Sequence, residues 1–369
     1  MTPAAATQAV LWSGLLIGLL LGAVAQASRF CTMGALADWF GYGGTGRLMM
    51  WVLAVAVAAV GAWGLMQAGW LDAPRAAAWN ERFLWLSYPL GGTIFGLGMV
   101  LASGCPQRNL VRAGAGNLKA LVTLLVAALA ADMTLRGLLA MPRSNWLDAV
   151  AVSLGRPQDL ASLLAAATGL GADALRGPLV AALVAVAGVV VWRQRQAMEP
   201  LHWLGGLGVG ALAVAAWATT GHLGFLAEHP ETLEPAWLGT YSRRPEGLTF
   251  AAPVAHGLQL LTLWSDRNTT ATFGVVVTLG VVLGSAASAL VRREFRVEGF
   301  AGTRDLADHL AGAVLMGFGG VTAMGCSIGQ GVSGLSLLSG GAVLAVAGMA
   351  VGVKAGLAWQ TWRLDRDEA

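Results

Sequence analysis

The chain has 369 residues, of which 56% are hydrophobic and only 12% are charged, and its formal net charge is +3. A globular protein carries about 25% charged residues, so this composition excludes a string of ordinary soluble domains. The arginines lie in short loops between apolar runs, which indicates membrane topology and excludes nucleic-acid binding as the main role. The apolar runs are long and unbroken, whereas strands of a membrane barrel alternate over about 10 residues. The sequence therefore predicts an all-α integral membrane protein.

About 20 consecutive apolar residues are needed for a helix to cross a bilayer. Nine segments of the chain meet this need. They are residues 10–28, 48–70, 83–104, 118–140, 177–193, 202–220, 271–291, 306–325 and 340–360. Two further apolar stretches, 30–40 and 248–264, are too short or too interrupted to cross. We expect them to form re-entrant or interfacial segments, in addition to the nine spans.

The distribution of Lys and Arg predicts the orientation. They gather in the loops that follow the first, third, fifth and seventh segments and in the tail after the ninth. The opposite loops are mixed or acidic, although they also contain Arg136, Arg143, Arg156 and Arg176. By the positive-inside rule, we expect the N-terminus outside and the C-terminus on the cytoplasmic side of the membrane. The first apolar segment has no basic residue before it, so we expect a retained span rather than a cleaved signal peptide.

An internal repeat links the two halves of the chain. The segment FGLGMVLASGC (95–105) matches MGFGGVTAMGC (316–326) at positions that include Gly96, Gly98, Ala102, Gly104 and Cys105, with a constant offset of 221. This predicts a first repeat over 1–140, a connector with the fifth span over 141–200, and a second repeat over 201–369. The repeats lie five spans apart, and this odd displacement makes them antiparallel, as in transporters whose site lies near the bilayer midplane. The alternative is that two interfacial helices share small residues by chance.

Each of the three cysteines stands at a break in an apolar run. Cys31, Cys105 and Cys326 lie far apart and have neither metal-ligand nor paired spacing, so we expect no metal and no cofactor. Gly104 and Gly325 precede two of them and permit unusual backbone angles. A short helix that begins after such a break offers free N–H groups to an anion. The alternative is that each cysteine is only a small buried apolar residue.

The segments around these cysteines resemble the YeeE/YedE family of bacterial inner-membrane proteins. The similarity covers nearly the whole chain and depends on five motifs, namely RFCTMGAL, ASGCPQRNLVRAG, RPEGLTFAAP, LGSAASALVRREFR and GCSIGQGVSG. This resemblance implies uptake of thiosulfate, or a role in related sulfur or selenium metabolism. It also implies that the three cysteines line the pathway, and that a separate cytosolic TusA-like sulfurtransferase is a partner.

We therefore expect a permease for a small sulfur-containing anion. The ion would meet Cys326 on the outer side, Cys105 near the middle and Cys31 on the inner side. Polar residues at the breaks would hold its oxygens, and arginines would attract it from the cytoplasm. The polar residues are Gln107, Asn109, Ser327 and Gln330, and the arginines are Arg29 and Arg108, whereas Arg112 is better explained by topology alone.

Two charges inside the spans, Asp132 and Lys354, occupy near-equivalent places in the two repeats, and we expect them to form an ion pair. Two other functions stay open at this point. A membrane thiol or sulfur-transfer enzyme would need cysteines that meet in space. A membrane anchor for a soluble sulfur-handling complex would not need the cysteines at all.

Overall fold

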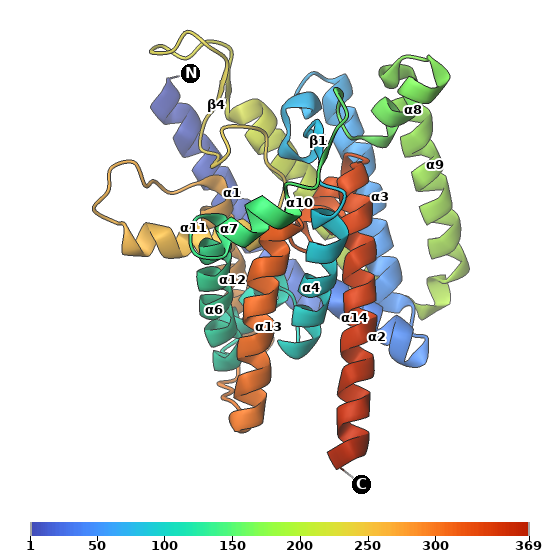
Figure 1. Cartoon of the computed structure of the whole chain (residues 1–369), viewed down its shortest axis with the longest axis vertical. Helices are drawn as coiled ribbons and strands as arrows, with labels where there is room; N and C mark the ends of the chain where they lie inside the picture. Colours follow the sequence, from blue (N-terminus) through green and yellow to red (C-terminus); the bar gives the residue numbers. More distant parts are fainter. Residues whose placement is uncertain (1, 368–369) are drawn as a thin grey trace.

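The computed structural model describes residues 2–367, and it is a bundle of helices whose two chain ends lie at opposite ends of the molecule (Figure 1). The long helices are α1 (Pro3–Ser28), α3 (Gly46–Gln67), α4 (Ser87–Leu101), α6 (Leu118–Leu135), α9 (Ala172–Arg193), α10 (Pro200–Ala218), α12 (Phe273–Val291), α13 (Thr303–Thr322) and α14 (Gly340–Asp367). Sheet is confined to two short antiparallel ribbons. They pair β1 (Arg82–Phe83) with β2 (Val152–Ser153), and β3 (Phe225–Leu226) with β4 (Ala236–Trp237). The predicted all-α membrane class is confirmed.

Short helices stand between the long ones. They are α2 (Thr32–Tyr42), α5 (Pro106–Gly114), α7 (Ala140–Pro142), α8 (Leu160–Thr168) and α11 (Ala251–Thr262). Shorter 3-10 turns are η1 (Ala73–Arg75), η2 (Ala77–Trp79) and η4 (Arg195–Ala197), and wider π-helical turns are η3 (Arg143–Leu147), η5 (Thr219–Leu223) and η6 (Gly329–Gly334). The apolar stretches 30–40 and 248–264 thus become α2 and α11, which are too short to cross a bilayer.

Eight helical stretches, rather than nine, are long and apolar enough to cross a membrane in the described part of the chain. The expected span that is missing from this set, 306–325, is present as α13, but this helix is not apolar enough to be counted. Its first two turns carry Arg304, Asp305 and Asp308, which lower its hydropathy. Asp308 is paired with Arg363 of α14, so charge from two neighbouring helices is neutralised there.

Small residues let the long helices approach closely. Helix α1 packs along α12, where a side chain at Gly18 would stand 2.4 Å from the carbonyl oxygen of Val277 and one at Gly284 would stand 1.9 Å from that of Leu19. The glycine stripe of the first apolar segment is therefore a helix interface, as small residues commonly are in membranes.

The main helix pairs follow a regular pattern. Helix α1 packs on α12 while α3 packs on α10, and α4 packs on α14 while α6 packs on α13. In each pair, one helix comes from the first half of the chain and the other comes from the second half. A twofold relation between the halves would produce such pairs, and the division into inverted repeats stays a prediction.

Candidate functional site

Two of the cysteines follow helix breaks that share one backbone conformation. After α4, Ser103 and Gly104 have φ values of 54° and 157°, and after α13, Met324 and Gly325 have 58° and 159°. Glycine adopts such positive φ at the lowest cost, which explains the Gly-Cys sequence at both places. Cys105 then begins α5, and Cys326 is followed by η6. The matched positions of the sequence thus mark two equivalent turns of the chain.

The third cysteine begins α2. Helix α1 ends where Arg29 takes a left-handed φ of 55°, and Cys31 follows as the N-cap of α2. The Cys31 Sγ accepts a hydrogen bond from the backbone N–H of Gly34 at 3.3 Å. A free N–H at the start of the helix therefore points at sulfur, which is the place where a helix best receives negative charge.

The structure brings the three thiols together in the core. All three cysteines are free and buried. Cys105 lies beside Cys31 and beside the hydroxyl of Ser327, and it is close enough to Cys326 to interact with it electrostatically. Residues more than 200 positions apart in the sequence thus converge from three helix breaks. A random set of buried apolar cysteines has no reason to meet in this way.

Several buried polar atoms around the thiols have no hydrogen-bond partner among the described residues. They are both amide atoms of Gln107, one Nη of Arg108, Oδ1 of Asn109 and Oγ of Ser327. Gln107, Asn109 and Ser327 are fully buried. More than about 90% of buried polar groups in proteins are paired, and an unpaired one costs about 1–3 kcal/mol. This concentration of unpaired donors and acceptors indicates a place for a polar species.

Two amides hold the breaks themselves. Asn109 donates from Nδ2 to the carbonyl oxygen of Gly104 at 2.9 Å, and Gln330 donates from Nε2 to that of Ala323 at 2.7 Å. Both residues lie four positions after a cysteine. The sequence predicts that these amides bind the anion. In the structure, the amide nitrogen of each donates to a backbone carbonyl of its own turn, so both residues also position the turns. Arg112 likewise donates to the carbonyl of Ser103 at 3.2 Å.

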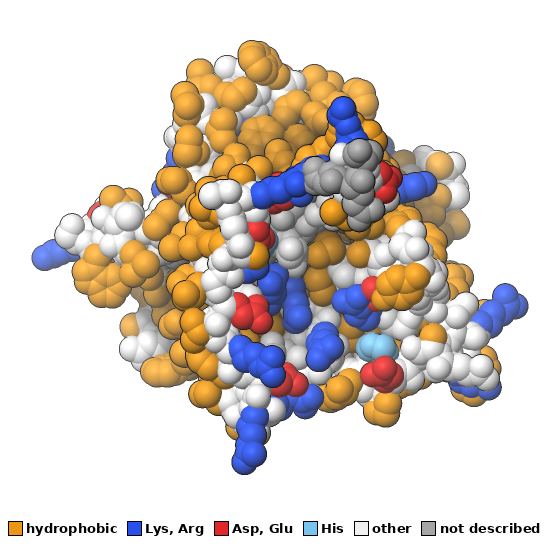
Figure 2. Space-filling model, turned by 90° about the horizontal axis from the view of Figure 1, so that it is seen from below, with side chains coloured by type: hydrophobic (Ala, Val, Ile, Leu, Met, Phe, Trp, Pro, Cys, Tyr) orange, Lys and Arg blue, Asp and Glu red, His pale blue; other side chains and the backbone are white. Residues whose placement is uncertain are grey.

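A basic cavity lies on the side of the molecule where the chain ends. Arg29, Arg47, Arg292 and His202 are among the residues that line it, and its volume is about 700 Å³. Seen from this end, Lys and Arg side chains surround a hollow, with acidic side chains between them (Figure 2). Arg29 is exposed on this side, and its role in attracting the anion stays a prediction.

One ion pair beside Cys31 is absent from the sequence prediction. Asp38 of α2 pairs with Arg47 of α3 through both carboxylate oxygens, and Tyr42 donates to the same carboxylate. A side chain at Gly34 would collide with the Arg47 guanidinium, so this charge lies within one helical turn of Cys31. Arg47 counts only as a topology signal in the sequence. Asp38, the lone acidic residue of an apolar segment, was the available clue.

Two cavities lie on the other side of the cysteines. A narrow one of about 120 Å³ is lined by Thr249, Gln330 and Glu246 among others, and Thr249 Oγ1 lies 3.8 Å from Cys326 Sγ. A wider one of about 420 Å³ is lined by arginines and tryptophans, namely Arg75, Arg243, Arg244, Trp79 and Trp237. The loops on this side, which the sequence describes as mixed or acidic, therefore form a local basic surface.

The sequences of known proteins match most of this chain. A family described as sulphur transport matches residues 27–355. The chain belongs to the sulphur transport family. It is 32% identical over 330 residues to a protein of Escherichia coli (strain K12) named thiosulfate transporter TsuA, which covers 87% of this chain and 86% of the relative. A protein of the same name from Spirochaeta thermophila is 26% identical over 335 residues, which is 89% of this chain and 93% of the relative.

Membership confirms the resemblance to the YeeE/YedE family and favours a transporter over an enzyme or an anchor. Together with the apolar helices, it identifies a multi-pass membrane protein. The matched region begins just before Cys31 and ends after Cys326, so all three cysteines lie within the part that defines the family.

The expected ion pair between Asp132 and Lys354 is wrong. Asp132 of α6 instead accepts a hydrogen bond from Gln259 of α11, and Lys354 is exposed on α14. The reason is that α6 packs on α13 and α11, whereas α14 packs on α4. Residues at equivalent positions of the two halves need not be neighbours, because each helix packs chiefly on a helix that is not its equivalent.

Proposed function

We propose that this chain takes up thiosulfate, or a closely related sulfur anion, through a path lined by Cys326, Cys105 and Cys31. The observation that carries the proposal is the meeting of three buried thiols amid unpaired polar atoms of Gln107, Arg108 and Ser327. The names of the two relatives support thiosulfate as the substrate.

The chemistry of the site suits such an anion. Thiosulfate is a small dianion with one soft terminal sulfur and three oxygens. A thiol is a weak donor and a weak acceptor, so contact with sulfur at several stations holds the ion without trapping it. Conduction needs binding that is weak enough for the ion to leave. The unpaired groups of Gln107, Ser327 and Arg108 would serve the oxygens and the charge.

The cavities suggest the order of the stations. The arginine-lined cavity and the narrow cavity beside Thr249 lead toward Cys326. Cys105 and Cys31 follow, and the basic cavity near Arg29 then opens on the side of the C-terminus. With the N-terminus outside and the C-terminus in the cytoplasm of a bacterial inner membrane, this direction is uptake. The reversed orientation would reverse the order.

Arg47 completes the inner end of the path. In the structure its guanidinium is held by Asp38, so the charge beside Cys31 is neutralised. A sulfur dianion that reaches Cys31 would compete with Asp38 for Arg47, and the carboxylate would then displace the ion into the inner cavity. Exchange between two anionic partners gives release without a large movement of the backbone.

The two halves, 1–140 and 201–369, would be inverted repeats joined by 141–200. The matched φ values at the two breaks support this, as does the exchange pattern of the helix pairs. A separate cytosolic TusA-like sulfurtransferase would accept the sulfur after release, and membrane lipid would surround the spans.

Uptake of sulfur-labelled thiosulfate by cells that lack other sulfate and thiosulfate importers tests the proposal. We expect uptake with the wild-type protein and a loss of about tenfold or more with Cys105→Ala or Cys326→Ala at matched membrane expression. Thr134→Ala is the control, because that hydroxyl donates to the carbonyl of Ala130 within α6 and lines neither the narrow nor the basic cavity. Uptake that survives both cysteine substitutions would contradict the path.

A further inference from the structure

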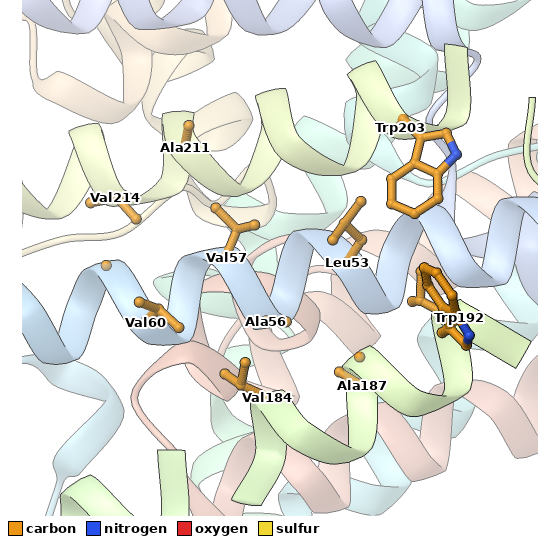
Figure 3. Close-up of a pocket in the computed structure, with 13 residues that line it drawn as sticks. Leu53, Ala56, Val57, Val60, Val184, Ala187, Trp192, Trp203, Ala211 and Val214 are labelled. Atoms are coloured by element: carbon orange, nitrogen blue, oxygen red, sulfur yellow. The ribbon is translucent and has the colours of Figure 1, made fainter. Parts of the chain in front are cut away.

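A groove on the lipid-facing side of the bundle separates α9 from its neighbours. Helix α9 packs chiefly on α3 and α8, and α10 packs on α3 and α1. Helix α3 is therefore the floor of the groove, while α9 and α10 are its walls (Figure 3). The groove has a volume of about 620 Å³.

The lining of the groove is apolar, and five of its thirteen residues are Ala or Gly. Ala56 of α3, Ala187 and Gly188 of α9 and Ala211 of α10 keep the floor and walls low (Figure 3). All three helices are among those long and apolar enough to span a membrane. A groove between such helices is exposed to lipid acyl chains and not to water, so segments of acyl chains fill it.

The length and position of the groove fit one leaflet. On α9 it runs from Val184 to Trp192, which is about 12 Å along a helix, and half the hydrocarbon core is about 15 Å. It ends where α9 ends, at the same end of the bundle as the C-terminus (Figure 1). Trp192 and Trp203 lie on its two walls at this end (Figure 3), which is where tryptophan prefers the membrane interface.

Positive charge stands at the mouth of the groove. Arg193 ends α9, and Arg195 follows in η4 with its guanidinium 4.2 Å from the Trp192 ring centroid. Both arginines are exposed. Basic pockets between membrane helices attract anionic lipid head groups.

We propose that this groove binds one acyl chain of an anionic phospholipid, with its head group at Arg193 and Arg195. The lipid would tie α9 to the rest of the bundle from the leaflet on the C-terminal side. This site is distant from the cysteines and independent of the transported substrate.

Native mass spectrometry of the purified protein in detergent tests the site, with phosphatidylglycerol and phosphatidylcholine added separately. Gly188→Leu fills the groove, and no atom lies within 4 Å of a side chain added there, so the fold is retained. Val189→Leu, on an exposed position outside the groove, is the matched control.

We expect a stable phosphatidylglycerol adduct of the wild type and of Val189→Leu, and a loss of about fivefold or more with Gly188→Leu. Arg195→Gln should lower the preference for phosphatidylglycerol over phosphatidylcholine about fivefold. Equal adducts for Gly188→Leu and Val189→Leu would overturn the proposal. A lipid-free dimer that Gly188→Leu dissociates would also overturn it, because a second copy would then occupy the groove.

Discussion

The breaks at Cys105 and Cys326 have the same backbone and different chemistry. Both turns use the same pair of positive φ values, and both are held by an amide four residues after the cysteine. The sulfur of Cys326 accepts N–H bonds from Phe250 at 3.2 Å and Gly329 at 3.4 Å. Cys105 caps no N–H of its own helix. The sulfur of Cys326 is therefore anchored by backbone N–H groups, whereas the sulfur of Cys105 is not.

The two breaks also differ in the charge of the residue three positions after the cysteine. Three residues after Cys105 stands Arg108, with one buried Nη that has no hydrogen-bond partner among the described residues. Three residues after Cys326 stands Gly329, where a side chain would meet Thr249 Oγ1 at 2.6 Å. A repeated turn thus presents a cation on one side only. The comparison indicates that the backbone geometry recurs in both halves, while the buried cation stands only beside Cys105.

The largest expected effect follows from this asymmetry. Arg108→Gln removes the buried Nη that has no hydrogen-bond partner among the described residues. A hydrogen bond to a charged group contributes about 1.5–3 kcal/mol, so thiosulfate uptake should fall about 10- to 100-fold. Arg112→Gln is the control, because Arg112 holds the carbonyl of Ser103. Initial uptake rates at matched expression measure both. Equal losses for the two variants would remove Arg108 from the path.

Stability should separate the two cysteines. Cys326→Ala leaves the buried N–H of Phe250 without its acceptor, at a cost of about 1–3 kcal/mol in the free energy of unfolding. Cys105→Ala leaves no such group and should cost less. Thermal unfolding in detergent compares the two variants. A larger loss for Cys105→Ala would reverse the assignment of anchored and unanchored sulfur.

The inner ion pair gives an intermediate effect. Asp38→Asn removes the competitor for Arg47, so the ion should bind more tightly and leave more slowly, with KM and maximal uptake rate each lowered about fivefold. Adding Arg47→Gln should restore KM toward the wild-type value. Transport kinetics of the single and double variants test this. An unchanged KM in Asp38→Asn would show that Arg47 does not meet the substrate.

The smallest effect concerns pH on the side of the narrow cavity. Burial raises the pKa of the Glu246 carboxyl above its usual range, and this group lines the cavity that leads to Cys326. A raised pKa keeps the acid neutral to higher pH, so a dianion should pass more easily as the pH falls, by about twofold between pH 7 and pH 5. Glu246→Gln should abolish this dependence. Uptake at several external pH values measures it, and a slope that persists in the variant would assign it to another group.

Sequence reasoning predicted the two equivalent turns because the relevant features are local. The Gly-Cys turns at Gly104 and Gly325 depend on neighbouring residues, and the length of an apolar segment predicts a membrane helix. It missed the Arg47–Asp38 pair and mispaired Asp132, because both depend on which helices meet. The effect of the charged first turns of α13 was likewise missed, because the segment 306–325 is apolar on average. Contacts between distant segments, rather than local pattern, decide these cases.

Binding of labelled thiosulfate to the purified protein, with an excess of sulfate as competitor, tests the central claim most directly. Sulfate has the same charge and lacks the terminal sulfur that the thiols would contact. The account predicts that the wild type retains thiosulfate in excess sulfate, and that Cys105→Ala loses this preference while it remains folded. Sulfate that displaces thiosulfate as well as thiosulfate itself does, or a Cys105→Ala variant that still prefers thiosulfate, would contradict it.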